Sequence, residues 1–503
     1  MQTEIIKEAI QHLTQRGFTI HSITCDGTAT NMSTGKQLGC NFKQEHFQTY
    51  FPHPYTEGEF IYFIFDPCHL LKNLRNYLGQ YTKIFDEEGG QISWKYIIAL
   101  HEFQLKDNLN LATKLAGKHI HYHNNKMKVK LAAQTFSSSV AQAINFLRDE
   151  KCLPQFQKSQ STTNFINIID ELFDVCNSSN PIGKYRKAPI CESNLESKIE
   201  FLQMASSYLK NLKGADGVNM YKANKKQGFL GFMITISSLI GLARRLLIQL
   251  NQRYFLTYKI SQDHLETFFS QIRNSNGFNN NPNCLSFRYA LRKNMLKNGI
   301  KPSAKANCID QSEQYQDKMA QKLHAKKSKN PTNLQALVDV ISNPSIVHDD
   351  INFYLAGFIG RKLRKTIKCN SCSFDLVKKA SELNNHQNAA FTNIRNRGGL
   401  LASEGINSIV QTADVCLRNL IATRKISSLS AASVIRRQVF DCEKHTHLLD
   451  TMCCRKQIIF LVCKLYTKIM MHHHAQLITE RCIRKNQGSM RHKFTKAVHF
   501  LHH

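Results

Sequence analysis

Three carboxylates stand in the sequence where they could bind divalent metal ions: Asp26, Asp66 and Glu266. Carboxylate oxygens are hard ligands that suit Mg²⁺, and carboxylates from two neighbouring strand ends and one helix can converge on it. A pair of such ions can activate an attacking oxygen and stabilise a leaving oxygen during cleavage of a phosphodiester. Aspartates at strand ends also cap helices, so each aspartate has a structural alternative.

The two aspartates lie in segments that predict an open α/β sheet. Apolar residues recur at helical spacing over residues 2–16, Gly17 ends that helix, and residues 18–26 alternate like a strand. Residues 59–66 form a short, continuous apolar run, which is typical of an inner strand covered on both faces. Both segments end on an aspartate, and open α/β sheets place their chemistry at this end of the strands.

Helices dominate the next part of the chain. After the first strand, residues 27–39 form a turn of small residues that leads into a helix. From residue 93 to residue 258 apolar residues recur every three or four positions without a convincing strand pattern, so a mainly helical block is expected. A helix over 261–273 then places Asp263 and Glu266 on one face.

The remaining residues divide into a linker and a helical region. Residues 301–340 are polar and rich in Lys and Gln, as linkers are, and residues 341–503 are expected to be all-α. The last forty residues carry eight Lys and Arg against one acid, so they form a basic arm or face. The predicted fold class is α/β plus α.

The charge balance points to a polyanionic partner. The chain has 67 Lys and Arg against 37 Asp and Glu, a formal charge of +30, which a compact protein tolerates best beside nucleic acid. An anionic membrane is the rival, but no apolar run approaches the roughly 20 residues that span a bilayer. The sixteen cysteines are scattered and the first residues lack an apolar signal region, so a reducing compartment is expected.

Five motifs together resemble one family. CDGTATN (25–31), FIFDPCHLLKNLRN (63–76), FDVCN (173–177), SQDHLETFFSQIRNSNGFNNNP (261–282) and FYLAGFIGRKL (353–363) resemble, in order and spacing, the P-element-like transposases, which include the THAP-domain transposases of animals. The resemblance runs along the whole chain and loosens across 301–340 and after about 450.

The resemblance implies an RNase H-like core split by an all-α insertion that binds GTP. The core would comprise residues 1–92 and 259–300, and the insertion residues 93–258. Residues 301–340 would be the linker, and residues 341–503 the basic α-helical C-terminal region. In this family Mg²⁺ supports DNA cleavage and strand transfer, and GTP is a positioning cofactor. The implied partners are the transposon ends and target DNA in the nucleus, bound by a homo-oligomer, with no role for a membrane.

Roles carry over onto matching residues only. By motif, Asp26 resembles the second and Glu266 the third catalytic, metal-binding acid. The guanine-nucleotide segment of the family matches Phe173, Asp174 and Asn177, and Asp263 would face the same nucleotide. Two weaker candidates for that pocket are Lys114 and Val129. Asp66 is interpreted as mainly structural, with a further metal-binding role left open.

Nothing in the chain resembles a P-loop. The motif GxxxxGK[ST] is absent, so a triphosphate would be neutralised by lysines such as Lys114, Lys128 and Lys130. Those lysines could equally form a solvated face. A GTP-hydrolysing switch is therefore the weakest functional hypothesis.

The sequence departs from the family pattern at its start. The first catalytic aspartate of the family would fall some tens of residues before Met1, and the zinc-binding THAP domain and a coiled coil would lie further upstream. Because a two-metal site loses its shared anchor without one of three carboxylates, the chain as given is expected to be inactive or nearly so. The alternative is a non-catalytic DNA- or protein-binding factor derived from a transposase.

One further pattern could bind a metal. Cys369 and Cys372 form a CxxC, and Cys442, His445 and His447 lie downstream, so a Cys₂His₂ zinc site is geometrically allowed. The long spacing between the two halves is not diagnostic. Buried or free thiols are the alternative.

Overall fold

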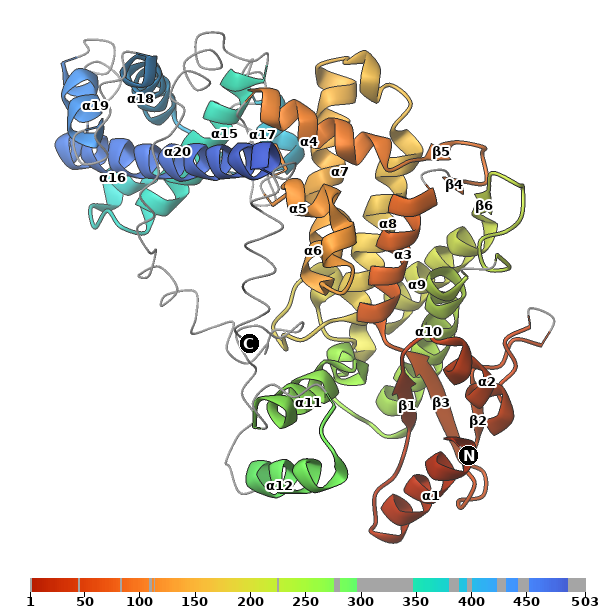
Figure 1. The fold of residues 1–503 in the computed structure, drawn as a ribbon. Coiled ribbons are helices and arrows are strands. Elements are labelled where there is room, and N and C mark those ends of the chain that lie inside the picture. The colour runs from red at the N-terminus through yellow and green to blue at the C-terminus, as the bar shows by residue number, and fades with distance from the viewer. Residues whose placement is uncertain are drawn as a thin grey trace. The chain divides into compact units, whose positions relative to one another are not determined.

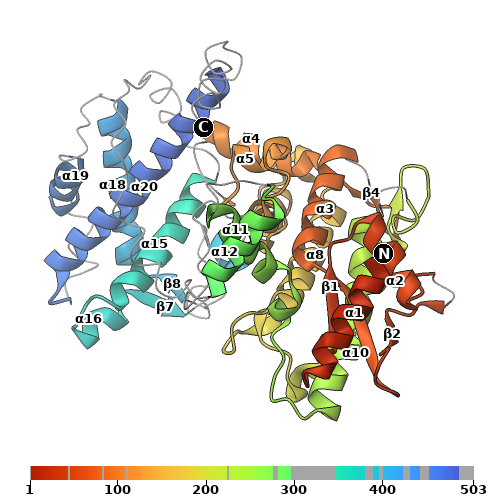
Figure 2. The same ribbon diagram turned by 60° about the horizontal axis from the view of Figure 1, so that its bottom comes forward.

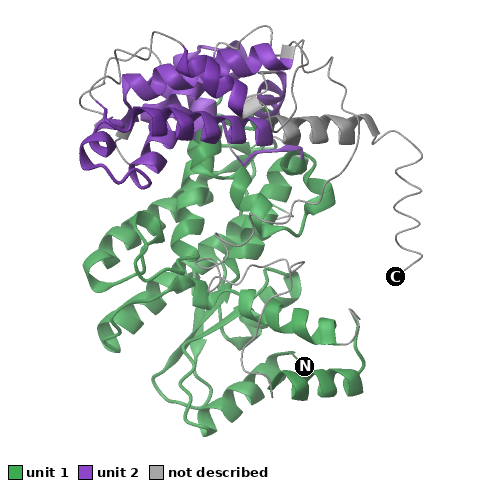
Figure 3. Cartoon of the chain, turned by 90° about the vertical axis from the view of Figure 1, so that its left-hand side faces the viewer, with its two compact units in different colours: residues 1–97, 118–141, 158–326 green, residues 98–117, 142–157, 327–503 purple. Residues whose placement is uncertain are grey.

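The computed structural model describes residues 2–43, 46–81, 84–107, 111–112, 114–223, 226–275, 281–295, 347–379, 389–395, 400–422, 431–441 and 452–486. These fall into two compact units, coloured separately in Figure 3. Unit 1 comprises residues 1–97, 118–141 and 158–326, and unit 2 comprises residues 98–117, 142–157 and 327–503. This division cuts across the expected domain boundaries at residues 93 and 258, which stay predictions.

Unit 1 contains the predicted sheet. Its strands are β1 (Ser22–Cys25), β2 (Tyr50–Pro52) and β3 (Phe60–Phe65), in the order β1-β3-β2. β3 is central, parallel to β1 and antiparallel to β2, which confirms that it is an inner strand. The helix α1 (Gln2–Gln15) precedes β1 and α3 (Pro67–Tyr81) follows β3, as expected.

The segment after β1 differs from its prediction. The expected turn of small residues is almost entirely a helix, α2 (Ala29–Leu38), and the turn itself is only Gly27 and Thr28. Thr28 caps α2, because its hydroxyl accepts a hydrogen bond from the Asn31 N–H. The small residue Gly35 allows α2 to pack closely on two phenylalanines, because a Cβ at this position would lie 3.0 Å from Phe42 and 3.1 Å from Phe63.

The block from 93 to 258 is helical, as predicted, with one exception. Its helices are α4 (Lys95–Asp107), α5 (Gly117–Ile120), α6 (Val129–Thr135), α7 (Ser138–Asn145), α8 (Gln160–Cys176), α9 (Leu195–Asn211) and α10 (Gln227–Arg244). The exception is the short strand β6 (Lys213–Gly214), which pairs with β4 (Ile84–Phe85); β4 also pairs with β5 (Gln91–Ile92). Two-residue strands are too short to show alternation, so the sequence could not reveal them. Two more helices follow α10, namely α11 (Asp263–Ser275) and α12 (Cys284–Met295).

The helix α10 lies against β3 and completes its hydrogen bonding (Figures 1 and 2). The Thr235 hydroxyl accepts from the Phe65 N–H at 3.2 Å and donates to the Phe65 carbonyl at 2.8 Å. The Ser238 hydroxyl donates to the Phe63 carbonyl at 2.6 Å. These backbone groups lie beyond the reach of β2, so α10 stabilises the end of the strand that precedes Asp66.

The same helix corrects the expectation that no apolar run approaches membrane-spanning length. Residues 227–249 are long and apolar enough by composition to span a membrane, with a mean hydropathy of 1.5 over an 18-residue window. Burial within the protein explains this apolar composition, because 61% of the 18-residue window is buried and the helix packs on β3, α3 and α9. A Cβ at Gly231 would lie 2.3 Å from Leu70 on α3, so glycine allows this close approach.

Unit 2 is mainly helical but is not all-α. Its C-terminal helices are α15 (His348–Arg364), α16 (Asn370–Phe374), α17 (Ala390–Arg395), α18 (Glu404–Ala422), α19 (Ala431–Phe440) and α20 (Arg455–Asn486). The strands β7 (Val377–Lys379) and β8 (Leu400–Ala402) form an antiparallel pair that the sequence did not predict. Their three-residue length is again too short for a pattern. The linker 301–340 lies outside the described residues.

The core of unit 2 forms between α15, α18, α19 and α20. Within it Asp414 accepts hydrogen bonds from Tyr466 at 2.6 Å and pairs with His348 at 2.6 Å and Arg418 at 2.8 Å. The segment 142–157 belongs to this unit too, since Lys151 forms an ion pair with Asp350 at 2.6 Å.

Candidate active site

Asp26 and Asp66 lie side by side at the carboxyl ends of two paired strands. β1 and β3 are parallel with Cys25 opposite Phe65, so each aspartate is the next residue after the last pair. The Asp66 N–H donates to the Cys25 carbonyl at 2.9 Å. The predicted strand-end placement of both carboxylates is therefore present in the structure.

The Asp26 carboxylate is held by the start of the following helix. Its Oδ1 accepts from the Asn31 side-chain amide at 2.6 Å and from the Thr28 N–H at 3.3 Å. Both hydrogen bonds fall on Oδ1, and within the described residues Oδ2 has no donor. The capping interpretation and the metal-binding interpretation therefore do not compete for the same oxygen.

His69 connects Asp66 to Glu266. Its Nδ1 lies 2.5 Å from Asp66 Oδ2 and its Nε2 lies 3.5 Å from Glu266 Oε1. Asp66 is almost fully buried and also accepts from the Cys68 N–H at 3.2 Å, whereas the Glu266 side chain is 28% exposed. These contacts agree with the interpretation of Asp66 as mainly structural, and they add a contact with His69 that was not predicted.

A cavity of about 440 Å³ opens beside these groups. Asp26 and His69 both line it, together with Gly27, Thr28, Ala29, Asn73, Asn76, Tyr77, Gln80 and Gln227. His69 also contacts Glu266, so one histidine lies near both the second and the third predicted acid, which are 240 positions apart in the sequence.

The turn before α11 explains how Glu266 reaches the sheet. The 3₁₀ turn η8 (Thr257–Ile260) lies next to β1 and against the end of α8. The Thr257 hydroxyl donates to the Val175 carbonyl at 2.5 Å and accepts from the Ser178 N–H at 2.9 Å. The Tyr258 N–H donates to the Ser178 carbonyl at 3.1 Å. α11 therefore starts from a fixed point shared by the sheet and the insertion.

The predicted guanine-nucleotide residues lie at that same point, at the end of α8. Phe173 is 9% exposed, and Asp174 forms an ion pair with Lys187 at 3.3 Å. Asn177 is the residue that ends α8, and its side-chain oxygen is buried without a hydrogen-bond partner. A buried amide oxygen without a donor costs free energy, so a donor from water or from a ligand would stabilise this position.

The loop that carries Lys187 is held in place by hydrogen bonds from Lys198. Lys198 donates to the carbonyls of Arg186 and Ala188 at 3.1 and 2.6 Å. Burial, together with the neighbouring charge of Arg186, lowers the pKa of Lys198 to about 8. This ammonium group therefore positions the loop beside Asp174.

The other predicted nucleotide-binding residues lie on elements other than α8. Asp263 begins α11 just after the turn that contacts α8, and its N–H donates to the Ser261 hydroxyl at 3.4 Å. Val129 begins α6, which packs against α3, with exposed Lys128 and Lys130 on either side. Lys114 is exposed and belongs to unit 2. The roles of these residues stay predictions.

Sequence reasoning missed the part played by His69. Its signal was present, because an aspartate followed three residues later by histidine at the start of a helix puts both side chains on one face. The role of Arg75 was missed for a different reason. Its side chain is fully buried and donates to the carbonyls of Asn125 and Lys126 at 3.2 and 3.0 Å. Burial lowers its pKa to about 10. A sequence does not distinguish such an arginine from one on a DNA-binding surface.

Four family models match successive parts of the chain. They are the TNP-like RNase H N-terminal domain over residues 1–39, the TNP-like GTP-binding insertion domain over 68–189, the TNP-like RNase H C-terminal domain over 258–292, and the C-terminal domain of DNA transposase THAP9 over 342–476. Their order agrees with the expected arrangement of a split core around an insertion.

Individual relatives agree with the family models. The chain is 31% identical over 295 residues to the human DNA transposase THAP9, which covers 58% of this chain and 32% of that protein. It is 25% identical over 389 residues to the Transposable element P transposase of Drosophila melanogaster, covering 72% of this chain and 48% of that protein. The chain thus spans a third to a half of the length of these relatives.

A solved structure shows the same architecture. The Drosophila P element transposase strand transfer complex matches with a TM-score of 0.51 and 25% identity, covering 58% of this chain and 64% of that one. The resemblance therefore holds in sequence, in domain order and in fold. The chain belongs to the family of P-element-like transposases.

Proposed function

We propose that this chain provides the DNA-handling core of a P-element-type transposase, with Mg²⁺-dependent cleavage and strand transfer and GTP as cofactor. The observation that supports this best is that His69 lines a cavity together with Asp26, at the ends of β1 and β3, and also contacts Glu266. This arrangement would not be expected in an unrelated basic helical protein.

The donor set at this point fits Mg²⁺. The groups are carboxylate oxygens, which are hard ligands, and one oxygen of Asp26 has no donor within the described residues. The proposed ligands are Asp26 and Glu266, and Asp66 acts through His69. When bound, a pair of such ions activates the attacking oxygen and stabilises the leaving oxygen. The carboxylates do not form a closed ligand set, since in the described part of the chain only a group of cysteines brings three or more ligand atoms within 4.8 Å of one another.

The proposal requires one more carboxylate. Within the described residues β1 pairs with a strand on its β3 side only. A further strand bearing an aspartate on the other side of β1 would complete the three-acid arrangement that the family uses. We therefore propose that residues 1–503 alone cleave DNA very slowly or not at all, and that the same residues in a longer polypeptide that supplies this strand are active.

The end of α8 fits a guanine nucleotide. Guanine presents N–H donors along one edge, and the unpartnered oxygen of Asn177 and the carboxylate of Asp174 are acceptors. Phe173 offers an apolar surface beside them, and Asp263 would complete the pocket from α11. Because α11 carries Glu266 three residues later, a nucleotide bound here would fix the helix that bears the third acid.

The charge of +30 supports DNA as the macromolecular partner. A nuclear place of action follows from the proposed activity on DNA. Neutralisation of phosphates releases counterions, so the affinity for DNA is expected to fall steeply as the salt concentration rises. A homo-oligomer that holds two DNA ends remains part of the proposal.

A cleavage assay with Mg²⁺ tests the catalytic proposal. In a longer polypeptide that includes an upstream strand with an aspartate, Glu266→Gln is expected to reduce nicking by about a thousandfold or more, because a metal ligand is lost. Glu196→Gln is the matched control, since Glu196 is an exposed glutamate on α9 that pairs with Arg244 across 3.7 Å.

Three outcomes separate the hypotheses. Equal nicking by Glu266→Gln and the parent polypeptide would overturn the assignment of Glu266. Full activity from residues 1–503 alone would show that no further carboxylate is needed. DNA binding without cleavage by every polypeptide would favour the alternative, a non-catalytic binding factor with a transposase fold.

A further inference from the structure

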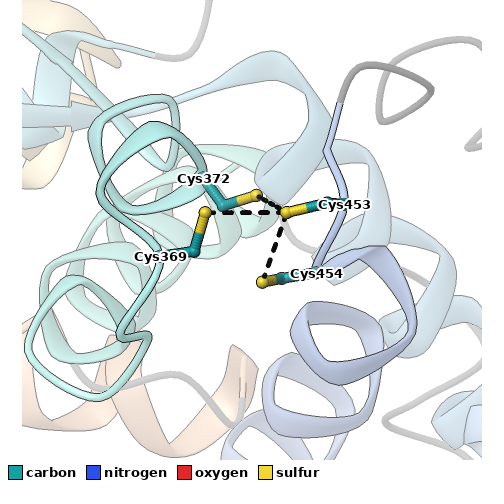
Figure 4. A group of neighbouring side chains, drawn as sticks. All are labelled: Cys369, Cys372, Cys453 and Cys454. Carbon is teal, nitrogen blue, oxygen red and sulfur yellow. Dashed lines mark hydrogen bonds between the residues drawn. The ribbon is translucent and has the colours of Figure 1, made fainter.

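Four cysteines of unit 2 lie in one cluster, shown in Figure 4: Cys369, Cys372, Cys453 and Cys454. Their sulfur atoms all lie within 4.8 Å of one another. The first pair comes from the turn after α15 and the start of α16, and the second pair immediately precedes α20. We call this set the four-cysteine cluster.

The distances inside the cluster match a tetrahedral zinc site. Cys453 Sγ lies 3.6 Å from Cys369 Sγ, 3.5 Å from Cys372 Sγ and 3.8 Å from Cys454 Sγ. Zinc–sulfur bonds of about 2.3 Å in tetrahedral geometry place neighbouring sulfurs about 3.8 Å apart. Figure 4 shows the four side chains directed toward a common point.

Other uses of four cysteines fit less well. A disulfide requires sulfurs about 2.05 Å apart, and these cysteines are free thiols. An iron–sulfur cluster separates its thiolates more widely, because each binds a different iron or opposite sides of the cluster. We infer that the four-cysteine cluster binds a single zinc ion as a closed structural site.

The cluster includes a pair of cysteines that the sequence did not suggest. The CxxC of Cys369 and Cys372 is one half, as expected, but the other half is the adjacent pair Cys453 and Cys454. The earlier candidates Cys442, His445 and His447 lie outside the described residues. Adjacent cysteines have no recognised zinc spacing, so the sequence did not single them out.

The surroundings of the cluster support a structural role. Cys372 is 1% exposed and belongs to the hydrophobic core, and the partly buried Cys369 and Cys454 pack against that core. A bound zinc would link the turn after α15 to the start of α20 across 84 positions of the sequence. Such a link stabilises the fold because it closes a long loop.

Zinc would also balance the charge of the four-cysteine cluster. Thiolates gathered this closely repel one another unless a cation lies among them. Each thiol would release its proton to solvent when it binds zinc.

Metal analysis of the full 503-residue chain tests the inference. After expression with zinc and purification under reducing conditions, Cys369→Ser and Cys453→Ser are each expected to carry about one zinc ion per chain fewer than the parent protein. Cys284→Ser is the control, because Cys284 is an exposed free thiol on α12 of unit 1 and should leave the zinc content unchanged.

Cobalt gives a second readout that does not depend on the folding of a variant. Co²⁺ added to the metal-depleted parent protein is expected to give the intense sulfur-to-cobalt charge-transfer and d–d bands of a tetrahedral tetrathiolate site. Cys369→His should retain a tetrahedral site with weaker sulfur-to-cobalt absorption, since three thiolates remain.

Several results would overturn the zinc site. They are a metal content that is the same in the parent and both serine variants, a cobalt spectrum without thiolate charge transfer, and mass-spectrometric detection of a disulfide among the four cysteines in freshly reduced protein. Iron and labile sulfide in the purified protein would identify an iron–sulfur cluster instead.

Discussion

The carboxylate site of unit 1 and the four-cysteine cluster of unit 2 are both assembled from segments distant in the sequence, but they are held in different ways. In unit 1 each acid is fixed by another protein group, Asp26 by Asn31 and Asp66 by His69, and a cavity stays open beside them. In unit 2 the cysteines have mainly one another as partners. This difference agrees with the proposed roles, because catalytic metal sites keep a position open for substrate whereas structural metal sites are closed by protein ligands.

The largest effect that would sharpen this comparison is expected in the core of unit 2. Asp414→Ala removes the shared acceptor of His348, Tyr466 and Arg418, leaves a buried charge without its partner, and should destabilise unit 2 by about 3 kcal/mol. Hydrogen exchange should accelerate in α18 and α20 and not in β3. Equal acceleration in both units would show that they unfold together and are not separately stabilised.

The pH dependence of this network follows from the same residues. Burial acts to raise the pKa of Asp414, but hydrogen bonds from His348 and Tyr466 and the charge of Arg418 outweigh it and lower the pKa. Because the folded pKa lies below the unfolded value of about 3.9, the stabilisation is complete above that value and is lost as the pH falls through the folded pKa. Exchange in α18 should therefore accelerate below about pH 4, and Asp414→Asn should remove this component.

An intermediate effect is expected at the end of α8. Asp174→Ala should weaken GTP binding by about ten- to a hundredfold, since a charged hydrogen bond contributes about 1.5–3 kcal/mol. Calorimetry can compare it with Glu171→Ala, which removes a carboxylate from the same helix that pairs with Arg186 instead. Equal affinities of the two variants would remove Asp174 from the nucleotide site.

The smallest effect is expected where α10 meets the sheet. Thr235→Val removes two hydrogen bonds to Phe65 and should destabilise unit 1 by about 1–2 kcal/mol. Ser237→Ala is the control, because Ser237 is only partly buried and bonds to a side chain, that of Thr49. The stability of both variants can be measured by denaturant unfolding, with the loss of GTP binding as the signal. A Thr235→Val protein as stable as the control would show that the sheet does not depend on α10.

Much of the carboxylate site could be predicted because its signals are local. β1 alternates, β3 is a continuous apolar run, and a helix was expected around Glu266; the ends of these segments fix where the acids lie. The contact through His69 could not be derived from one segment, since Glu266 reaches it by way of a turn packed on α8. The pairing of Cys369 and Cys372 with Cys453 and Cys454 depends in the same way on how α15 and α20 pack, which no local pattern records.

The hydrogen bonds between Thr235 and Phe65 also set an order of events during synthesis. The two residues are 170 positions apart, and a ribosome adds about 5–20 residues per second. On the order of ten seconds or more therefore pass between the synthesis of Phe65 and that of Thr235, the partner of its backbone groups. During that interval the nascent N-terminal strands are exposed, and chaperone binding to this part of the chain is the expected consequence.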